Sequence, residues 1–222
     1  MNSIMEGKQM NLRILPKDKQ DIKSVEVLAR MDRAVVVPFI PDLLIWLQDI
    51  NWPIASAMVE LLLKYKVETI PHIKSIFSQN DYVWSYNILA YLLKEWEPDL
   101  VSKLTSNLLE LARNRDEHED IDLLAIDILW SCRLIEANDV TALLQEKMDD
   151  TKGELDRFTV EQIAVYKELE IERLSILNSD VKQIVTYIDL NRETLNQKVQ
   201  YENWLRRHQE IEVMARNYID II

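Results

Sequence analysis

Glycine is almost missing from this chain of 222 residues, which holds only Gly7 and Gly153. Phosphate-binding loops and tight β-hairpins depend on the backbone freedom that glycine supplies, so the sequence nearly excludes both. Hydrophobic residues make up 48% of the chain, a fraction typical of globular rather than disordered proteins. Leu, Ile, Glu and Lys are frequent, and this composition favours helices. The sequence therefore predicts an all-α fold.

A motif that begins with proline recurs at intervals near 30 residues. Ile40-Pro41-Asp42-Leu43 has a partial echo in Ile70-Pro71-His72-Ile73, and Pro98-Asp99-Leu100 follows after a further interval. Proline suits the first turn of a helix, where its missing N–H would have no partner. A period of this length is typical of stacked helical repeats. We therefore expect a HEAT-like α-solenoid of about three helix pairs, each opened by proline.

The expected pairs follow a first helix that ends near Met31. Trp52 and Trp84 take equivalent places in successive units, ahead of matching Leu-Leu-Lys sequences, so we expect both in the core between helices. A shorter helix over residues 140–148 should close the stack, which gives a first domain at 15–150. The first pair is expected to start at Pro38 or Pro41 and to run to 49, followed by 53–65. The second is expected at 68–77 with 81–95, and the third at 98–113 with 121–134.

The pattern changes after Gly153, where we place the domain boundary. Residues 155–177 and 181–222 are long, free of proline and heavily charged, and they keep helical spacing of apolar residues. They predict a second domain at 154–222, a long antiparallel helical hairpin that turns near Asp180. Two helices alone cannot fully bury such a pattern. The hairpin is therefore expected either to cover the end of the solenoid or to form a homodimer.

The net charge is −12, and residues 1–150 hold 25 acidic against 16 basic side chains. Such a chain repels phosphate backbones on average, so we expect no nucleic-acid partner. We expect a protein partner instead, and a basic one.

Cys132 is alone and lies in an apolar helical pattern, which indicates a buried, inert thiol in a reducing compartment. We find no apolar signal core and no run long enough to cross a bilayer. The predicted location is cytoplasmic, with no membrane partner.

A polar insertion at 114–120 is the first candidate site. His and carboxylates are metal ligands, but this run lacks the alternating oxygen donors and the turn glycine of a calcium loop. The three histidines and Cys132 offer no set of converging zinc ligands. We therefore predict no metal, no cofactor and no catalytic residue. The insertion is instead expected to be an acidic contact surface formed by Asp116, Glu117, His118, Glu119 and Asp120.

Asp49, Asn51 and Trp52 are the second candidate partner-binding group. Asp49 and Asn51 stand where a turn between two helices must be tied, which favours a structural role for both. Trp52 directly precedes Pro53 and is expected to be partly exposed at the edge of a repeat. Aromatic side chains on a helical-repeat surface can anchor a peptide.

The first half of the chain resembles a bacterial family of unknown function with HEAT-like helical repeats. The residues that carry the resemblance are Leu15-Pro16-Lys17-Asp18-Lys19 and the run from Pro41 to Ala55, PDLLIWLQDINWPIA. It covers roughly residues 15–135. The resemblance implies no catalytic residue, because the family's activity is not established. Related proteins resemble components of bacterial toxin–immunity gene neighbourhoods.

These observations favour a non-enzymatic protein–protein interaction module, of the immunity or inhibitor type, that binds a basic partner. The alternative is a helical-repeat enzyme that processes nucleic acid, similar to a DNA glycosylase. Such an enzyme combines aromatic residues and a catalytic carboxylate with a basic groove. The acidic excess in residues 1–150 argues against that groove.

Overall fold

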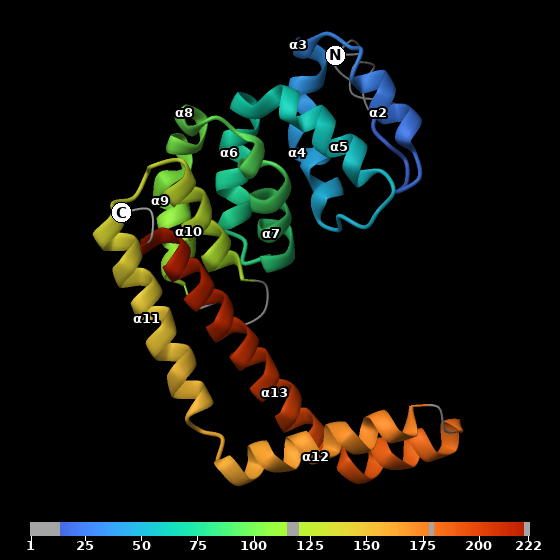
Figure 1. Cartoon of the computed structure of the whole chain (residues 1–222). Coiled ribbons are helices and arrows are strands. Elements are labelled where there is room, and N and C mark those ends of the chain that lie inside the picture. The colour runs from blue at the N-terminus through green and yellow to red at the C-terminus, as the bar shows by residue number, and fades with distance from the viewer. Residues whose placement is uncertain (1–13, 115–119, 178–179, 220–222) are drawn as a thin grey trace. The chain divides into compact units, whose positions relative to one another are not determined.

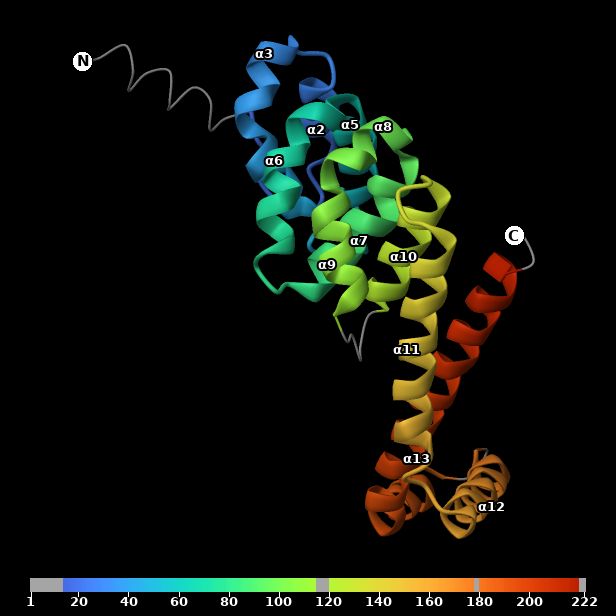
Figure 2. The same cartoon turned by 90° about the vertical axis from the view of Figure 1, so that its left-hand side faces the viewer.

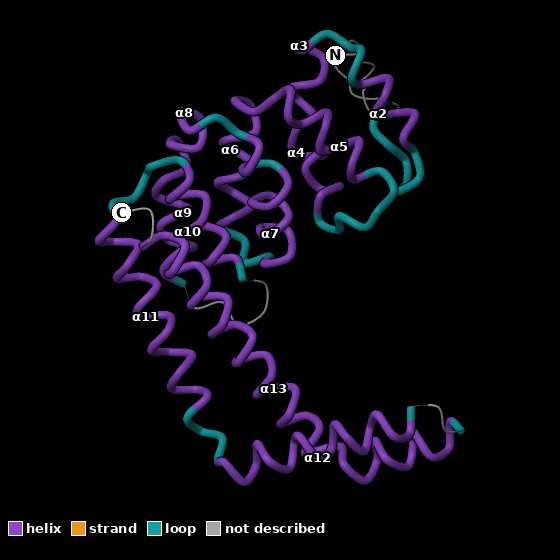
Figure 3. Tube along the Cα trace, viewed as in Figure 1, coloured by secondary structure: helices purple, strands orange, loops and turns teal. Residues whose placement is uncertain are grey.

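The computed structural model describes residues 14–114, 120–177 and 180–219 (Figure 1). Every regular element in these ranges is a helix, as Figure 3 shows, so the all-α prediction is confirmed. The chain forms two compact units, Met1–Glu136 and Ala137–Ile222. The sequence analysis placed the boundary at Gly153 instead. Each unit is described by itself.

The first unit consists of short helices, several of which tighten to a 3₁₀ turn at one end. A 3₁₀ turn at a helix end provides partners for backbone groups that the α-helix leaves open. In chain order the elements are α2 (Ile22–Leu28), α3 (Arg33–Val36), η1 (Val37–Phe39), α4 (Ile40–Leu44), η2 (Ile45–Leu47), α5 (Ala55–Leu62), η3 (Leu63–Tyr65), α6 (Lys66–Phe77), α7 (Tyr82–Tyr91), η4 (Leu93–Glu95), α8 (Pro98–Val101), η5 (Ser102–Leu104), α9 (Thr105–Arg113) and α10 (Ile121–Ser131).

Helices that follow one another in the chain pack as pairs: α4 with α5, α6 with α7, and α9 with α10. Neighbouring pairs are joined by α4 against α6 and by α7 against α10 (Figure 2). Their buried faces form a continuous apolar core that includes Leu43, Leu62, Ile88 and Leu129. The single helix predicted at 98–113 is divided into α8, η5 and α9.

Local sequence signals fix several of the helix starts. Asp21 caps α2 by accepting from the Ser24 amide at 3.3 Å, and Asp81 caps α7 by accepting from the Trp84 amide at 3.0 Å. Pro98 opens α8. The expectation that proline opens every unit is wrong for Pro71, which lies inside α6. Helix α6 already starts at Lys66, ahead of the proline. A helix can pass through proline when packing outweighs the one backbone hydrogen bond that proline cannot make.

Tryptophan burial follows the sequence prediction only in part. Trp84 is buried, as predicted, and so is Trp96. Trp52, expected to be the equivalent of Trp84 in the core, is only half-buried. The difference has a local cause, because Trp84 lies in the first turn of α7 whereas Trp52 lies in the loop before α5.

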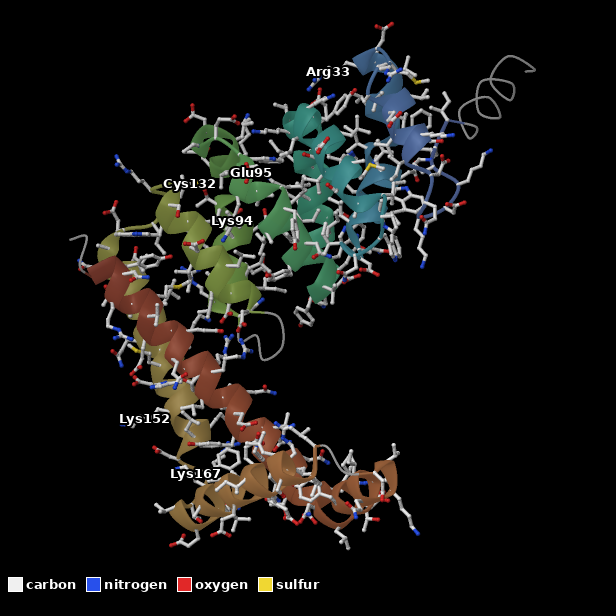
Figure 4. All side chains as sticks on the ribbon, turned by 45° about the vertical axis from the view of Figure 1, so that its right-hand side comes forward. Arg33, Lys94, Glu95, Cys132, Lys152 and Lys167 are labelled. Atoms are coloured by element: carbon white, nitrogen blue, oxygen red, sulfur yellow. The ribbon has the colours of Figure 1, made fainter. Side chains whose placement is uncertain are left out.

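A cation bridge recurs between successive helix pairs. Arg33 at the start of α3 donates to both carboxylate oxygens of Glu68 at 2.6 Å and to the Lys64 carbonyl at 2.8 Å. One pair later, Lys66 donates to the Glu95 carbonyl at 2.7 Å and to Glu97 at 3.0 Å. Each cationic side chain thus donates to a backbone carbonyl at the end of a helix and to a carboxylate a few residues later in the chain. The bridge follows the period of the sequence motif, and Figure 4 labels Arg33 and Glu95.

The second unit contains three helices: α11 (Ala137–Leu155), α12 (Val160–Ile176) and α13 (Val181–Ile219). The long α13 packs against α12 with its first part and against α11 with its second (Figures 1 and 2). The helix expected at 140–148 therefore belongs to this unit as part of α11. The predicted hairpin corresponds to α12 and α13, two of the three helices of the unit. Gly153 lies inside α11, where added side-chain atoms would meet nothing within 4 Å. It ends no helix because it occupies an ordinary helical position on the surface.

None of the helices in the described part of the chain is long and apolar enough to cross a membrane.

Candidate functional site

The Trp52 loop (residues 48–54) connects η2 to α5 and contains three of the predicted partner-binding residues. Asp49 accepts at Oδ1 from the backbone N–H of Asn51 at 2.9 Å and from its side-chain amide at 3.2 Å. The Trp52 amide donates to the Asp49 carbonyl at 3.2 Å. This is the local Asx turn that Asp favours. The turn predicted for Asp49 and Asn51 is therefore present, and it directs Asn51 to solvent.

Helix α7 holds this loop from the buried side. The Trp84 indole donates to the Leu44 carbonyl at 3.1 Å. The buried amide of Asn87 donates to the carbonyls of Leu47 at 2.9 Å and Gln48 at 3.3 Å. The last carbonyls of a helix have no partner within it, and a buried carbonyl without a partner is costly. Asn87 therefore fixes the backbone from which the loop departs.

Two tryptophans lie at the surface of the same region. The rings of Trp46 and Trp52 meet edge to face, with centroids 5.8 Å apart and planes at 70°, and both residues are half-buried. On the other side of the loop, the Ile54 amide donates to the Lys19 carbonyl at 3.2 Å. The loop is thus held at its start, at its turn and at its end. Asn51 and Pro53 of the loop are exposed, and Trp52 together with Trp46 of η2 is half-buried beside them.

The acidic insertion is only partly described. Asp116, Glu117, His118 and Glu119 lie outside the described residues, so the contact surface predicted there stays a prediction. Asp120 directly precedes α10 and has a left-handed backbone, with φ of 52°. Aspartate adopts this conformation more readily than most residues because its short side chain can bond locally. Asp120 lies at the start of α10, in a different helix pair from the Trp52 loop.

Among the residues that the structure describes, no three His, Cys, Asp or Glu side chains come together as a metal site. Cys132 follows α10 and is half-buried, less than its apolar sequence context suggested. Burial raises the pKa of its thiol above the ordinary value. A raised pKa lowers the thiolate fraction at neutral pH, so the thiol is a poor nucleophile.

One cluster in the second unit resembles a hydrolase triad in composition. The Thr151 hydroxyl lies 2.7 Å from His208 Nδ1, and His208 Nε2 lies 3.6 Å from Glu212. The hydroxyl also lies 3.0 Å from the carbonyls of Lys147 and Met148, one turn earlier in the same helix. Thr151 is 2% exposed, so the cluster fastens α11 to α13.

Sequence reasoning missed Asn87, which supports the loop. A signal was present, because Asn87 is an amide within the otherwise apolar α7 run and such a residue needs a buried partner. Its partners are 40 and 39 residues earlier in the chain, so spacing alone did not reveal them.

The sequence profile of the family described as "Domain of unknown function (DUF5071)" matches residues 14–129. The chain belongs to this family. A search of curated proteins finds no match to the chain. The matched range includes the Trp52 loop, Trp84 and Asn87, and it ends before the second unit begins.

Proposed function

We propose that the first unit is a non-enzymatic protein-binding module that contacts its partner through the Trp52 loop. One observation carries the proposal: the loop is fastened from its buried side by Asn87 while Trp46 and Trp52 stay half-exposed. A loop that is already ordered loses little entropy on binding. Tryptophan is the residue type that most often dominates a protein interface.

The charge of the chain favours a basic partner. Net charge is −12, and an acidic protein attracts a basic one over several ångströms before contact. Immunity and inhibitor proteins that neutralise basic enzymes use this form of steering, and we assign the chain to that type. Its lone cysteine, with a thiol of raised pKa, suits a reducing cytoplasm.

We further propose that the helix pairs form a HEAT-like α-solenoid. The support is the repeated cation bridge, in which Arg33 and Lys66 make matching contacts one helix pair apart. In a solenoid each repeat contacts mainly its neighbours, and successive repeats together present one surface. The Trp52 loop would then be one edge of that surface.

The test uses the full chain, immobilised in four separate forms: wild type, Trp52→Ala, Asn51→Ala and Tyr91→Ala. Tyr91 is an exposed aromatic on α7 and serves as the matched control. We expect at least one basic protein from the native host to bind wild type and Tyr91→Ala but neither loop variant. Far-UV circular dichroism should show equal helix content in all four. The purified partner should then bind more weakly as salt rises.

Two outcomes would contradict the proposal. In the first, every protein retained by wild type is retained equally by both loop variants. In the second, the chain binds random-sequence duplex DNA in a gel-shift assay at physiological salt, which would favour the nucleic-acid enzyme instead.

A further inference from the structure

Helix α13 carries an apolar stripe that faces solvent near its start. Val181 is 75% exposed, Val185 49% and Ile188 45%. Their spacing of four and then three residues places them on one face of the helix. Leu174 and Leu177, at the end of α12, are also more than half exposed and lie at the same end of the hairpin. Apolar residues exposed together, rather than singly, mark an interaction site.

This exposed stripe is separate from the face that α13 presents to α12. That second face is occupied: the Tyr187 hydroxyl donates to the Leu169 carbonyl at 2.7 Å, and Lys198 pairs with Glu170 at 3.0 Å. A rotation of α13 that buried Val185 against α12 would break both contacts. The stripe is therefore left uncovered by the hairpin itself.

We propose that a second copy of this chain covers the exposed stripe, with the two α13 helices antiparallel. The spacing of the stripe continues through Arg192 and Leu195, in the alternation of three and four residues that lets two helices pack side by side. The inference concerns residues 174–177 and 181–195 of the second unit. It does not depend on the partner proposed for the first unit.

Arg192 sets the orientation. Its side chain is 71% exposed and takes a place in the line of the stripe. In a parallel pair in register, Arg192 would face Arg192 of the second copy, and like charges repel. In an antiparallel pair with Val185 opposite Ile188 of the second copy, Arg192 lies opposite Val181, which its methylene groups can cover.

The flanking charges fit the same register. Lys182 and Asp189 are seven residues apart, at equivalent places beside the stripe. When two such helices run antiparallel with Val185 opposite Ile188, Lys182 of one copy lies beside Asp189 of the other. The two-fold symmetry repeats this pair on the other half of the contact. Both residues are exposed. Asp189 pairs through Oδ1 with Arg192 of its own helix at 2.6 Å, and its carboxylate can accept a second cation, Lys182 of the other copy.

The first experiment measures the mass of the full chain by sedimentation equilibrium over a dilution series. We expect wild type to have the mass of two chains and the double variant Val185→Glu/Ile188→Glu to have that of one. Leu190→Glu is the matched control, because Leu190 is 79% exposed on the same helix but outside the stripe. It should keep the mass of two chains. Circular dichroism checks that all three keep their helix content.

The second experiment tests the register by exchanging charges. Lys182→Glu alone and Asp189→Lys alone should each raise the dissociation constant roughly tenfold, since each replaces two symmetric attractions by two repulsions. The double variant Lys182→Glu/Asp189→Lys should return to the wild-type value. A wild-type mass of one chain at every concentration overturns the dimer. If the double variant keeps a dissociation constant as high as those of the single variants, the antiparallel register is wrong.

Discussion

The strongest structural test concerns Trp84, whose ring is buried and whose indole nitrogen donates to the Leu44 carbonyl at the end of α4 at 3.1 Å. Trp84→Phe keeps an aromatic ring but removes the donor, and leaving a buried carbonyl without this partner costs about 1–3 kcal/mol. Trp84→Ala also empties the site, and loss of a buried aromatic ring costs about 3–5 kcal/mol. We therefore expect stability to fall in the order wild type, phenylalanine, alanine.

The control is Tyr82→Ala, which removes an exposed ring from the first turn of the same helix and should change stability by less than about 0.5 kcal/mol. Urea unfolding followed by circular dichroism gives the free energies. Hydrogen exchange read on peptides of α4 and α7 assigns the loss to the first unit. If Trp84→Ala proves no less stable than Tyr82→Ala, the ring is not packed between these helices and the account of the Trp52 loop fails with it.

Three further outcomes are expected. Hydrogen bonds from Arg173 and Lys198 lower the pKa of Glu170 from 4.5 to about 2, so its ionised form stabilises the fold above pH 4.5 and the gain is lost as pH falls towards 2. Wild type should therefore be more stable than Glu170→Gln at pH 7 and lose that advantage between those values in acid-unfolding curves. Arg33→Lys should lower the melting temperature, because lysine cannot make the two-pronged contact with the carboxylate on α6. Cys132 should react with a thiol reagent more slowly than a free cysteine at pH 7, and the gap should narrow at high pH.

Where an element is determined by its own local sequence, the sequence was sufficient to predict it. Asp21 and Asp81 cap their helices through contacts that depend only on the local sequence, because a cap needs only backbone groups two or three positions away. The Asx turn at Asp49 and Asn51 is local in the same way. Pro71 misled the analysis because helix packing overrode a local preference.

Contacts between distant residues were beyond the reach of the sequence pattern. Asn87 donates to two carbonyls of an earlier helix pair. Its largely apolar surroundings in α7 indicate a buried partner, but nothing near it in the chain identifies which. The extent of α11 was underestimated for a related reason. Glycine favours a helix end, but Gly153 is exposed within a helix that packs against α13. At the Trp52 loop, the turn and the helix over 81–95 were therefore predicted, but the hydrogen bonds that join them were not.

The continuous α13 imposes a rule on how the chain can change in length. Lys198 fastens this helix to α12, and His208 fastens it to α11. One residue inserted between them would turn one contact by about 100° relative to the other, so one of the two must be lost. Seven or eleven residues change the phase by only about 20°. The same insertion also moves His208 along the helix by about 1.5 Å per residue, so α11 must change in length with it to keep Thr151 in reach. Descendants of this chain should therefore change α13 between these two residues in steps of seven or eleven, and only together with α11.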